Sequence, residues 1–521
     1  MAGLTYVLIP GRHHLLTRFQ ARYLHDLFGG RLRGIDDESV EFSAEPTLVW
    51  AVTSANHQNT RRNPVPANRR EAAIELFSLR EGVRSLVVPI FDTRPTERFA
   101  EITLKAIAAG AGGLVLDPAN CVVAVSTPSV IDMYRSLGFR IAALELGHSE
   151  SPLRAWQVLE LCAAGDPAWR QLAHEATIDV FDRYSLAAQV AMVLGDPVVG
   201  QEGSLTETRN YRAYAASFEA SAERKWRQAR PFVVPGRIVD VGCATGTVLE
   251  LASRDPGLQE SDLFGIEVSQ HLFEECVHKK SQAIFSNPNT FFFQRNILSG
   301  KVFADRSINT SLTFALTHEI ISYAGGVDAL TRLAGALFVQ TTQGGVWINS
   351  DVCGPERGDQ EVLLHFKEPG VDHPPRDLEG IPFDDAKRYL DNLTPAARFP
   401  QFAEDFRRLA HVPFAFSPLD AKSVRLPLSD AMEFMTRFVY TDSWLSECHE
   451  RFCALTWPDW VSLVHSAGFE IDPRSGPWRN EWMVENIFTP TAELTTVGGG
   501  DVIPWPTTHV FMVAIRPLTE A

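Results

Sequence analysis

The sequence has little cysteine and no long apolar run. Its 521 residues include seven cysteines, an odd count without any C-x-x-C pair, which disfavours a disulfide framework and excludes a zinc ribbon. Cys448, His449 and Cys453 lie close together but lack a zinc-ligand spacing, so no metal site is predicted. No run approaches the roughly 18 apolar residues of a membrane span, and no membrane partner is expected.

The sequence also has fewer positive than negative residues. The chain carries 48 lysine and arginine residues against 64 aspartate and glutamate residues, a net charge of −16. Such a field repels phosphate backbones and disfavours nucleic acid as a partner. The apolar run at residues 6–10 has only the length of a strand, and no cleavage site follows it. With few cysteines, these features predict a cytoplasmic protein, and the sequence does not indicate its oligomeric state.

The remaining composition is that of a folded globule, with 45% hydrophobic, 10% aromatic and 21% charged residues. The length requires several domains. Strands alternate with helices in two stretches, so we expect an α/β protein with two Rossmann-like doubly wound domains. The second is expected to carry a mainly helical cap insertion. The predicted segments are a first domain at 1–196, a linker at 197–209, a core at 210–352, a cap at 353–455 and the completion of the core at 456–521.

Short apolar runs place the expected strands. In the first domain they cover residues 6–9, 48–53, 85–90 and 121–126. The second domain opens with a helix at 210–230. Its strands are expected at 237–241, 263–268, 290–296, 309–316, 346–350 and 508–515. The cap would therefore follow the fifth strand, beside the carboxyl ends where open α/β sheets bind ligands.

The most informative segment is Ile238–Glu250. Asp240 ends a buried strand, and Gly242 and Gly246 allow a tight turn into a helix, a pattern typical of a nucleotide-binding loop. A dinucleotide fingerprint would require glycine at Ala244, so NAD is disfavoured. Glu267, at the end of the next strand, can accept hydrogen bonds from both ribose hydroxyls. The alternative is that these glycines serve only a turn.

From about Asn210 onward the chain resembles the class I S-adenosylmethionine-dependent methyltransferases. The resemblance lies in the glycine loop, in Glu267 and in the terminal Gly468-Phe469 and strand. It implies that S-adenosylmethionine is the cofactor and that the acidic position beside adenine is occupied here by Asn296. The residues implied to bind the cofactor are Asp240, Gly242, Cys243, Ala244, Gly246, Glu267, Val268, Asn296 and Ile297.

The fourth strand leads into Leu316-Thr-His-Glu-Ile-Ile-Ser-Tyr323, which is similar to a stretch in a subgroup of bacterial methyltransferases. The resemblance makes His318, Glu319 and Tyr323 catalytic candidates. His318 suits a general base because the reference pKa of histidine is near neutrality. The alternative is that His318 caps the following helix and that Glu319 is solvated. Glu433, Glu447, Glu450 and Arg451 in the cap are also similar to this subgroup, but an ion-paired surface is the favoured interpretation for the last three.

The opening segment Val7–Gln20 resembles the start of the nicotinamide-mononucleotide adenylyltransferases, which belong to the HxGH nucleotidyltransferases. Later segments extend the resemblance over the first domain, including Ser149–Arg154. It implies a nucleotide site formed by Gly11, Arg12, Thr17, Gln20, Ser54, Arg70, Ser126 and Arg154. The motif departs from the family at Gln20, where a histidine would carry charge. A non-catalytic or altered domain is therefore favoured over a working adenylyltransferase.

Together these features predict methyl transfer from S-adenosylmethionine to a small molecule, with a nucleotide conjugate among the candidate substrates. Two roles stay open for the first domain. It is either a nucleotide-binding module or the second activity of a bifunctional nucleotidylyltransferase and methyltransferase in a bacterial secondary pathway. A macromolecular substrate is disfavoured by the acidic charge and by the expected enclosing cap.

Overall fold

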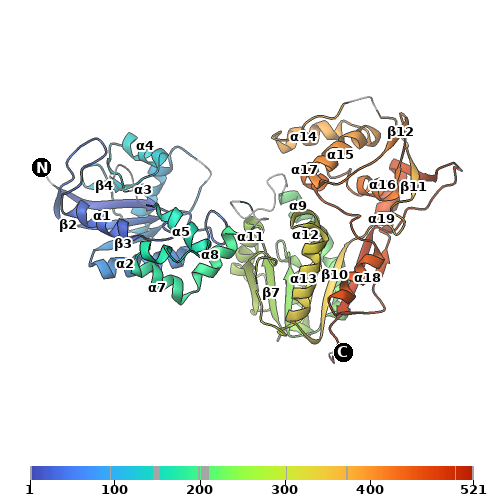
Figure 1. Cartoon of the computed structure of the whole chain (residues 1–521), viewed down its shortest axis with the longest axis horizontal. Helices are drawn as coiled ribbons and strands as arrows, with labels where there is room; N and C mark the ends of the chain where they lie inside the picture. Colours follow the sequence, from blue (N-terminus) through green and yellow to red (C-terminus); the bar gives the residue numbers. More distant parts are fainter. Residues whose placement is uncertain are drawn as a thin grey trace. The chain divides into compact units, whose positions relative to one another are not determined.

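The computed structural model describes residues 3–93, 96–144, 153–196, 200, 211–300, 302–370, 374–498 and 500–518, without the side chains of residues 211–214 and 217. The chain divides into two compact units, one comprising residues 1–196 and 200–203 and the other residues 197–199 and 204–521. The predicted linker at 197–209 lies outside the described residues except for Gly200. Each unit contains its own sheet, which is parallel in the first unit and mainly parallel in the second (Figure 1).

The sheet of the first unit has five strands in the order β3-β2-β1-β4-β5. All neighbouring strands in it are parallel. The strands are β1 (Leu4–Gly11), β2 (Phe42–Val52), β3 (Ser85–Pro89), β4 (Cys121–Ala124) and β5 (Arg140–Ala142). Helices α1 (Arg18–Phe28), α2 (Ala67–Glu81), α3 (Phe99–Gly110) and α4 (Pro128–Ser136) connect them. Continuous apolar runs such as Val7–Ile9 form the inner strands because a parallel sheet covered on both faces is buried throughout.

The first unit ends in helices. After β5 the chain forms α5 (Ala155–Ala163), α6 (Trp169–Leu172), α7 (Glu175–Arg183) and α8 (Leu186–Leu194). Their apolar faces pack together around buried side chains that include Val158, Phe181 and Val190. The segment at 149–152, which belongs to the nucleotidyltransferase resemblance, lies outside the described residues.

The main sheet of the second unit has the order β14-β17-β10-β9-β6-β7-β8. Its strands are β6 (Arg237–Val241), β7 (Asp262–Glu267), β8 (Thr290–Gln294), β9 (Ile308–Phe314), β10 (Thr341–Val352), β14 (Glu470–Ile471) and β17 (His509–Ile515). Strands β6 to β10 run parallel to their neighbours, and β17 is antiparallel to β10. The order reverses between β6 and β9, where open α/β sheets bind ligands at the carboxyl ends of the strands.

Helices cover both faces of this sheet. They are α9 (Tyr211–Ala229), α10 (Thr247–Ser253), α11 (Gln270–Ser281), α12 (Thr317–Tyr323), α13 (Gly326–Gln340) and α18 (Trp457–Ser466). One apolar core contains residues of α9 and α10, including Ala222 and Leu249. A second contains residues of α13 and α18, including Leu333 and Trp460. The α/β architecture with two doubly wound sheets is therefore as predicted.

The insertion after β10 contains helices and a second sheet. Its helices are α14 (Phe383–Asp391), α15 (Pro395–Ala410), α16 (Leu428–Met435) and α17 (Trp444–His449) (Figure 1). The sequence did not predict its four-stranded antiparallel sheet in the order β12-β13-β11-β16, formed by β11 (Glu361–Phe366), β12 (Ser417–Asp420), β13 (Ser423–Pro427) and β16 (Ala492–Thr496). Because β16 follows α18 in the chain, this sheet includes a strand outside the predicted segment at 353–455. The insertion after β10, together with β16, is called the cap below.

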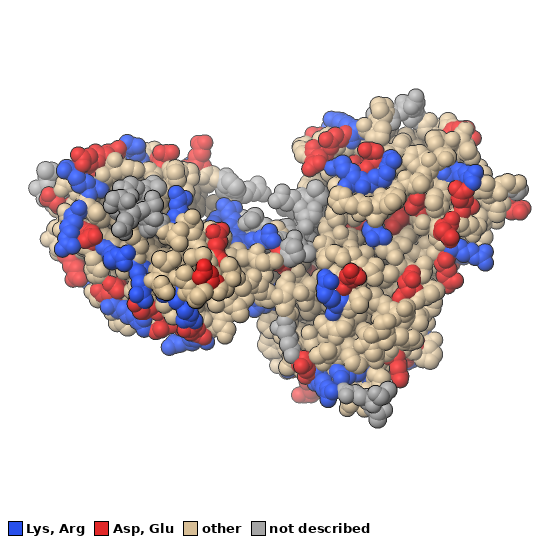
Figure 2. All heavy atoms as spheres, in the orientation of Figure 1, with Lys and Arg blue, Asp and Glu red and all other residues tan. Residues whose placement is uncertain are grey.

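Acidic and basic side chains are interspersed over the face of both units shown in Figure 2. Among the described residues, no helix is long and apolar enough to cross a membrane.

Candidate functional site

The glycine loop connects β6 to α10. Gly242 and Gly246 have φ values of +70° and +75°, which side chains rarely adopt. A Cβ atom on Gly242 would lie 2.8 Å from Cδ1 of Leu316. The backbone conformation therefore favours glycine at Gly242, and a larger residue would also displace the end of the Leu316 side chain. The loop places the amino end of α10 at the carboxyl edge of the sheet, as a ligand-binding loop requires.

Asp240 lies at the end of β6 and is fully buried. Within the described part of the chain, neither of its carboxylate oxygens has a hydrogen-bond partner. Burial raises the pKa of Asp240 to about 8; Lys225 opposes the rise and Glu267 adds to it. A buried carboxylate without a hydrogen-bond partner is costly, and a cationic group of a bound ligand would relieve that cost.

Glu267 connects the end of β7 to the glycine loop. Its Oε2 atom accepts a hydrogen bond from the backbone N–H of Ala244 (2.9 Å). Its Oε1 atom accepts from the N–H groups of Val268 (2.9 Å) and Ser269 (2.8 Å). Burial raises the pKa of Glu267 to about 7, although these three hydrogen bonds favour the ionised form. Because an ionised carboxylate has about four acceptor positions, one remains for a ligand hydroxyl.

A small, mainly apolar pocket lies beside the loop and opens to solvent. Gly242, Val268, Asn296, Ile297, Glu319 and Tyr323 are the predicted site residues that line it. Asp240, Cys243, Ala244, Gly246, Glu267 and His318 are not part of its lining. The thiol of Cys276 donates to the carbonyl of Ala244 (3.1 Å), and Oδ1 of Asn296 accepts from the N–H of Leu298 (2.9 Å).

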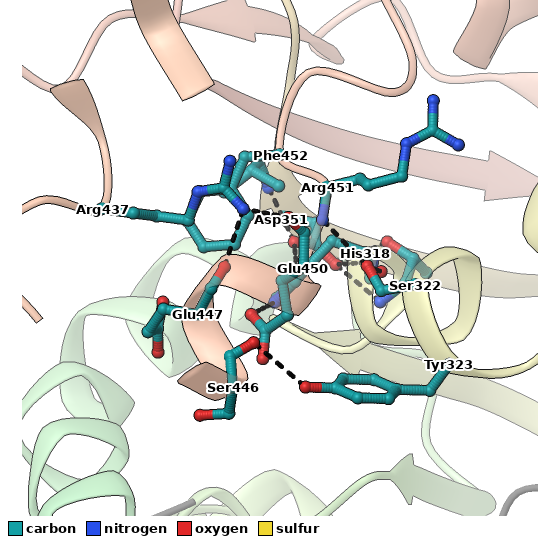
Figure 3. A network of polar contacts seen from close by, with 12 residues as sticks. His318, Ser322, Tyr323, Asp351, Arg437, Ser446, Glu447, Glu450, Arg451 and Phe452 are labelled. Carbon is teal, nitrogen blue, oxygen red and sulfur yellow. Dashed lines mark hydrogen bonds and ion pairs between the residues drawn. The ribbon is translucent and has the colours of Figure 1, made fainter. Parts of the chain in front are cut away.

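His318, at the start of α12, is buried between two carboxylates (Figure 3). Its Nδ1 atom donates to Oδ1 of Asp351 (2.6 Å), and its Nε2 atom lies 3.2 Å from Oε2 of Glu450. Burial lowers the pKa of His318, but Asp351 and Glu450 raise it by more and hold it well above its usual value. A histidine that already carries a proton cannot accept one from a substrate. The geometry therefore favours the orienting role for His318 over the general-base role.

Asp351 is the residue that fixes His318, and sequence reasoning did not select it. Beside the histidine ring, it accepts hydrogen bonds from the N–H and hydroxyl of Thr317 (2.6 and 2.5 Å) and from the N–H of Val352 (2.7 Å). Burial acts against the ionised form, but His318 and these bonds hold the pKa of Asp351 well below its usual value. Its position at the end of β10 was a signal, because that strand adjoins the strand that leads into His318.

The cap contacts α12 directly (Figure 3). The hydroxyl of Ser322 accepts a hydrogen bond from the N–H of Arg451 (2.9 Å). The hydroxyl of Tyr323 donates to the carbonyl of Ser446 (3.1 Å), and its ring stacks on His449 at 4.3 Å between centroids. Tyr323 therefore both lines the cavity and anchors the cap.

The expected ion-paired surface is wrong for Glu450, which is 2% exposed. The chain around it is fixed by Arg437, which is fully buried. The guanidinium of Arg437 donates to a carboxylate oxygen of Glu433 (2.5 Å) and to the carbonyls of Glu447 and Glu450. The other carboxylate oxygen of Glu433 accepts from the N–H of Cys453 (3.0 Å). Packing of the cap thus directs Glu450 toward His318.

The first unit has a larger cavity at the carboxyl edge of its sheet. Gly11, Arg12, Gln20, Ser54 and Ser126 line it, as do His13, His14 and Arg62. Burial lowers the pKa of His13 to about 4 and that of His14 well below its usual value. Nδ1 of His14 is buried without a hydrogen-bond partner among the described residues. Sequence reasoning did not select His13 and His14, although they directly follow Gly11 and Arg12.

Of the predicted residues of this site, three do not line the cavity, and Gln20 lines it but also caps a helix. Thr17 and Gln20 form a capping box at the start of α1, in which each side chain accepts a hydrogen bond from the other residue's N–H. Arg70 is fully buried and donates to the carbonyls of Arg12, Thr53 and Ser54 at 2.8–2.9 Å. Arg154 is exposed at the start of α5. Thr17, Arg70 and Arg154 are not part of the cavity lining.

Comparison with known proteins gave likeness only to solved structures. No protein-family model and no curated protein matches the sequence. A S-adenosylmethionine-dependent methyltransferase from Mesorhizobium loti is 12% identical, with 57% of this chain and 100% of that chain covered and a TM-score of 0.31. One from Clostridium acetobutylicum is also 12% identical, with 59% and 99% covered and a TM-score of 0.30. One from Methanosarcina mazei is 13% identical, with 56% and 97% covered and a TM-score of 0.27.

Proposed function

We propose that the second unit transfers a methyl group from S-adenosylmethionine to a small molecule. The observation that carries this proposal is the carboxylate of Asp240, buried without a hydrogen-bond partner at the end of the central strand β6. It stands directly before a loop whose φ of +70° at Gly242 favours glycine. The methionine part of the cofactor bears an ammonium group, whose charge would complement the carboxylate.

The order of the strands supports the same proposal. The sheet β8-β7-β6-β9-β10-β17-β14, with β17 antiparallel, has the arrangement of the methyltransferases that the sequence resembles. In that arrangement the loop after β6 and the acid at the end of β7 lie side by side. The hydrogen bond from the N–H of Ala244 to Glu267 joins these two elements.

Each of the site residues would then have a defined role. Bound S-adenosylmethionine supplies a methyl group whose bond to the sulfonium sulfur breaks as the acceptor atom bonds to the methyl carbon. Asp240 would bind the ammonium group, Glu267 a ribose hydroxyl and Asn296 the adenine edge. His318 and Tyr323 would orient the acceptor below the cap, which limits the entry of water.

Binding of the cofactor tests the proposal directly. Calorimetry on the full chain should show one site for S-adenosylmethionine or S-adenosylhomocysteine and none for NAD. Asp240→Asn should weaken this binding, whereas Glu275→Gln, an exposed change on α11, should leave it unchanged. Equal affinity of the wild type and Asp240→Asn would contradict the proposed role of Asp240. Absence of binding by the wild type would refute the function.

A specific observation favours a second function, nucleotide binding by the first unit. The cavity there is lined by Arg12 and Arg62, and His14 has a buried ring nitrogen without a hydrogen-bond partner among the described residues. Guanidinium groups bind phosphates, and a neutral imidazole nitrogen can accept from or donate to a base or ribose. We infer a site for a nucleotide or a nucleotide conjugate, in which Arg70 holds the loops and does not touch the ligand.

Chemistry at this second site separates the two roles that the sequence left open. The full chain should bind ATP or CTP, and His14→Phe should weaken binding because the apolar ring fills the same space without a hydrogen-bonding nitrogen. Pyrophosphate release with nucleoside triphosphate and a panel of phosphate or phosphonate acceptors would establish a bifunctional enzyme. Binding without release would establish a binding module, and no binding would refute the second function.

A further inference from the structure

Three potential metal ligands converge below the cap. His318 and Glu319 lie on α12, and Glu450 directly follows α17. One ligand atom from each of these side chains lies within 4.8 Å of the other two. All three are buried, with exposed fractions of 8%, 5% and 2%. Two ligands bound at about 2.1 Å to one ion are at most about 4.2 Å apart, so ligand atoms spread over up to 4.8 Å can share one cation after small side-chain shifts.

The environment of His318 supplies a second, independent observation. Its Nδ1 atom donates to Asp351 (2.6 Å), and Thr317 and Val352 hold that carboxylate in turn. Metal-binding histidines usually donate their other ring N–H to a carboxylate or a carbonyl, as Nδ1 of His318 does here. Here Nε2 points to Oε2 of Glu450, 3.2 Å away. The histidine is thus already oriented as a metal-bound histidine would be.

The charge of the cluster also favours a cation. Asp351, Glu319 and Glu450 are three buried carboxylates gathered around His318. Arg437 lies close by, but its guanidinium is engaged by Glu433 and by backbone carbonyls. Lys225 interacts with both Asp351 and Asp240. Gathering several carboxylates in a buried site is costly, and a bound cation would offset that cost.

We propose that His318, Glu319 and Glu450 bind one divalent cation, with Asp351 as the residue that orients His318. One imidazole and two carboxylates suit Mn²⁺, Fe²⁺ or Zn²⁺. On binding, the proton shared between Nε2 and Glu450 passes to solvent and the cation takes its place. The sequence predicted no metal because Glu450 is distant from His318 along the chain and approaches it only when the cap folds.

The proposal also defines the class of methyl acceptor. Three protein ligands leave coordination positions open, and Glu319 extends from the cluster to the cavity lining. An acceptor with a hydroxyl group and a neighbouring oxygen could bind the cation there, which lowers the pKa of the hydroxyl. The enzyme would then be an O-methyltransferase. This last step depends on the methyl-transfer function proposed above, whereas cation binding does not.

Direct titration of the cation tests the site. The full chain, stripped with EDTA, is titrated with MnCl₂, and free Mn²⁺ is followed by electron paramagnetic resonance. One Mn²⁺ per chain is expected. His318→Ala and Glu450→Gln should each weaken binding more than a hundredfold, and Asp351→Asn should weaken it about 10–100-fold because it supports a ligand. Glu447→Gln is the matched control, because Glu447 lies in α17, the helix that ends directly before Glu450. This variant should bind Mn²⁺ as the wild type does.

Further measurements distinguish loss of the cation site from misfolding and from failure of the methyl-transfer proposal. Glu450→Gln preserves shape, and its circular dichroism and S-adenosylhomocysteine binding report whether it folds. No stoichiometric binding of Mn²⁺, Mg²⁺ or Zn²⁺ by the wild type would overturn the site, as would unchanged binding by folded Glu450→Gln. Binding of an organic ammonium ion in place of any metal would also overturn it. Stoichiometric Mn²⁺ without S-adenosylhomocysteine binding would refute the methyl-transfer function and leave the cation site intact.

Discussion

The two Rossmann-like sheets differ in what their polar side chains do at the carboxyl edge. In the second unit, Asp240 has no hydrogen-bond partner among the described residues, and His318 is held between two carboxylates. In the first unit, Thr17 and Gln20 cap a helix and Arg70 binds backbone carbonyls. The second edge retains charges that a ligand could satisfy, whereas the first uses most of its motif residues to hold its own loops. A shared fold thus indicates where a site lies, and the polar groups that the protein itself does not satisfy indicate its chemistry.

The largest effect is expected for removal of Asp351. Asp351→Ala leaves the proton-bearing His318 and the donors of Thr317 and Val352 without their acceptor, so the free energy of unfolding should fall by about 3–5 kcal/mol. Asp182→Ala is the matched control, because Asp182 is half-exposed in its pair with Arg170 and should cost about 0–1 kcal/mol. Urea unfolding followed by tryptophan fluorescence measures both. Similar losses would show that the buried network is no more important than a surface pair.

Removal of Glu267 comes next and concerns the cofactor. Glu267→Ala removes the acceptor for the ribose and the anchor of the Ala244 N–H. Binding of S-adenosylmethionine should weaken by about 2–4 kcal/mol, of which the charge-assisted hydrogen bond to one ribose hydroxyl accounts for about 1.5–3 kcal/mol and the loosened loop for the rest. Calorimetry measures the loss. Glu267→Gln, which keeps the shape, should lose less, and an affinity unchanged in both variants would remove Glu267 from the site.

Substitution of Arg70 tests whether polar residues of the first unit hold its loops. Arg70→Lys replaces a fork that donates to the carbonyls of Arg12, Thr53 and Ser54 with a single ammonium group. The first unit should lose about 1.5–3 kcal/mol of stability. Arg80→Lys, an exposed change on the same helix, should cost less than about 1 kcal/mol. If Arg70→Lys instead unfolds like the wild type but loses nucleotide binding, Arg70 is a ligand-binding residue and the contrast between the two edges fails.

Sequence patterns predicted the parts of the fold in which local signals and burial agree. Inner parallel strands such as Val7–Ile9 are continuous apolar runs, so their positions were readable. Strand β5 was missed because three residues give no periodicity, and β12 was missed because all four of its residues are exposed. At Thr17 and Gln20 the same spacing fits a catalytic motif and a capping box, so the letters alone could not distinguish them.

In the candidate site, too, the sequence predicted what lies close together in the chain. The glycine loop and Glu267 were predicted because strand, turn and helix are contiguous in the chain. The cluster around His318 was not, since Glu450 comes from the cap, and only packing around buried Arg437 brings it to α12. Residues that meet through tertiary contacts between distant segments leave no local pattern.

The smallest predicted effect is the dependence of cofactor affinity on pH, and it concerns Asp240 directly. Burial raises the pKa of Asp240 to about 8, so the free protein holds it mostly protonated at pH 6–7. Folding takes up this proton relative to the unfolded chain, so the contribution to stability is present at low pH and is lost as the pH rises toward 8.

Binding of the cofactor's ammonium group has the opposite sign, because it requires the ionised carboxylate. Ionisation of Asp240 alone should therefore raise the affinity by up to about tenfold, or about 1.4 kcal/mol, between pH 6 and pH 7. Asp240→Asn should remove this contribution, and any slope that remains would belong to Glu267, whose pKa is raised to about 7. Calorimetry in buffers of matched ionic strength measures both slopes. An affinity of the wild type that falls as the pH rises would show that Asp240 binds its ligand as a protonated donor.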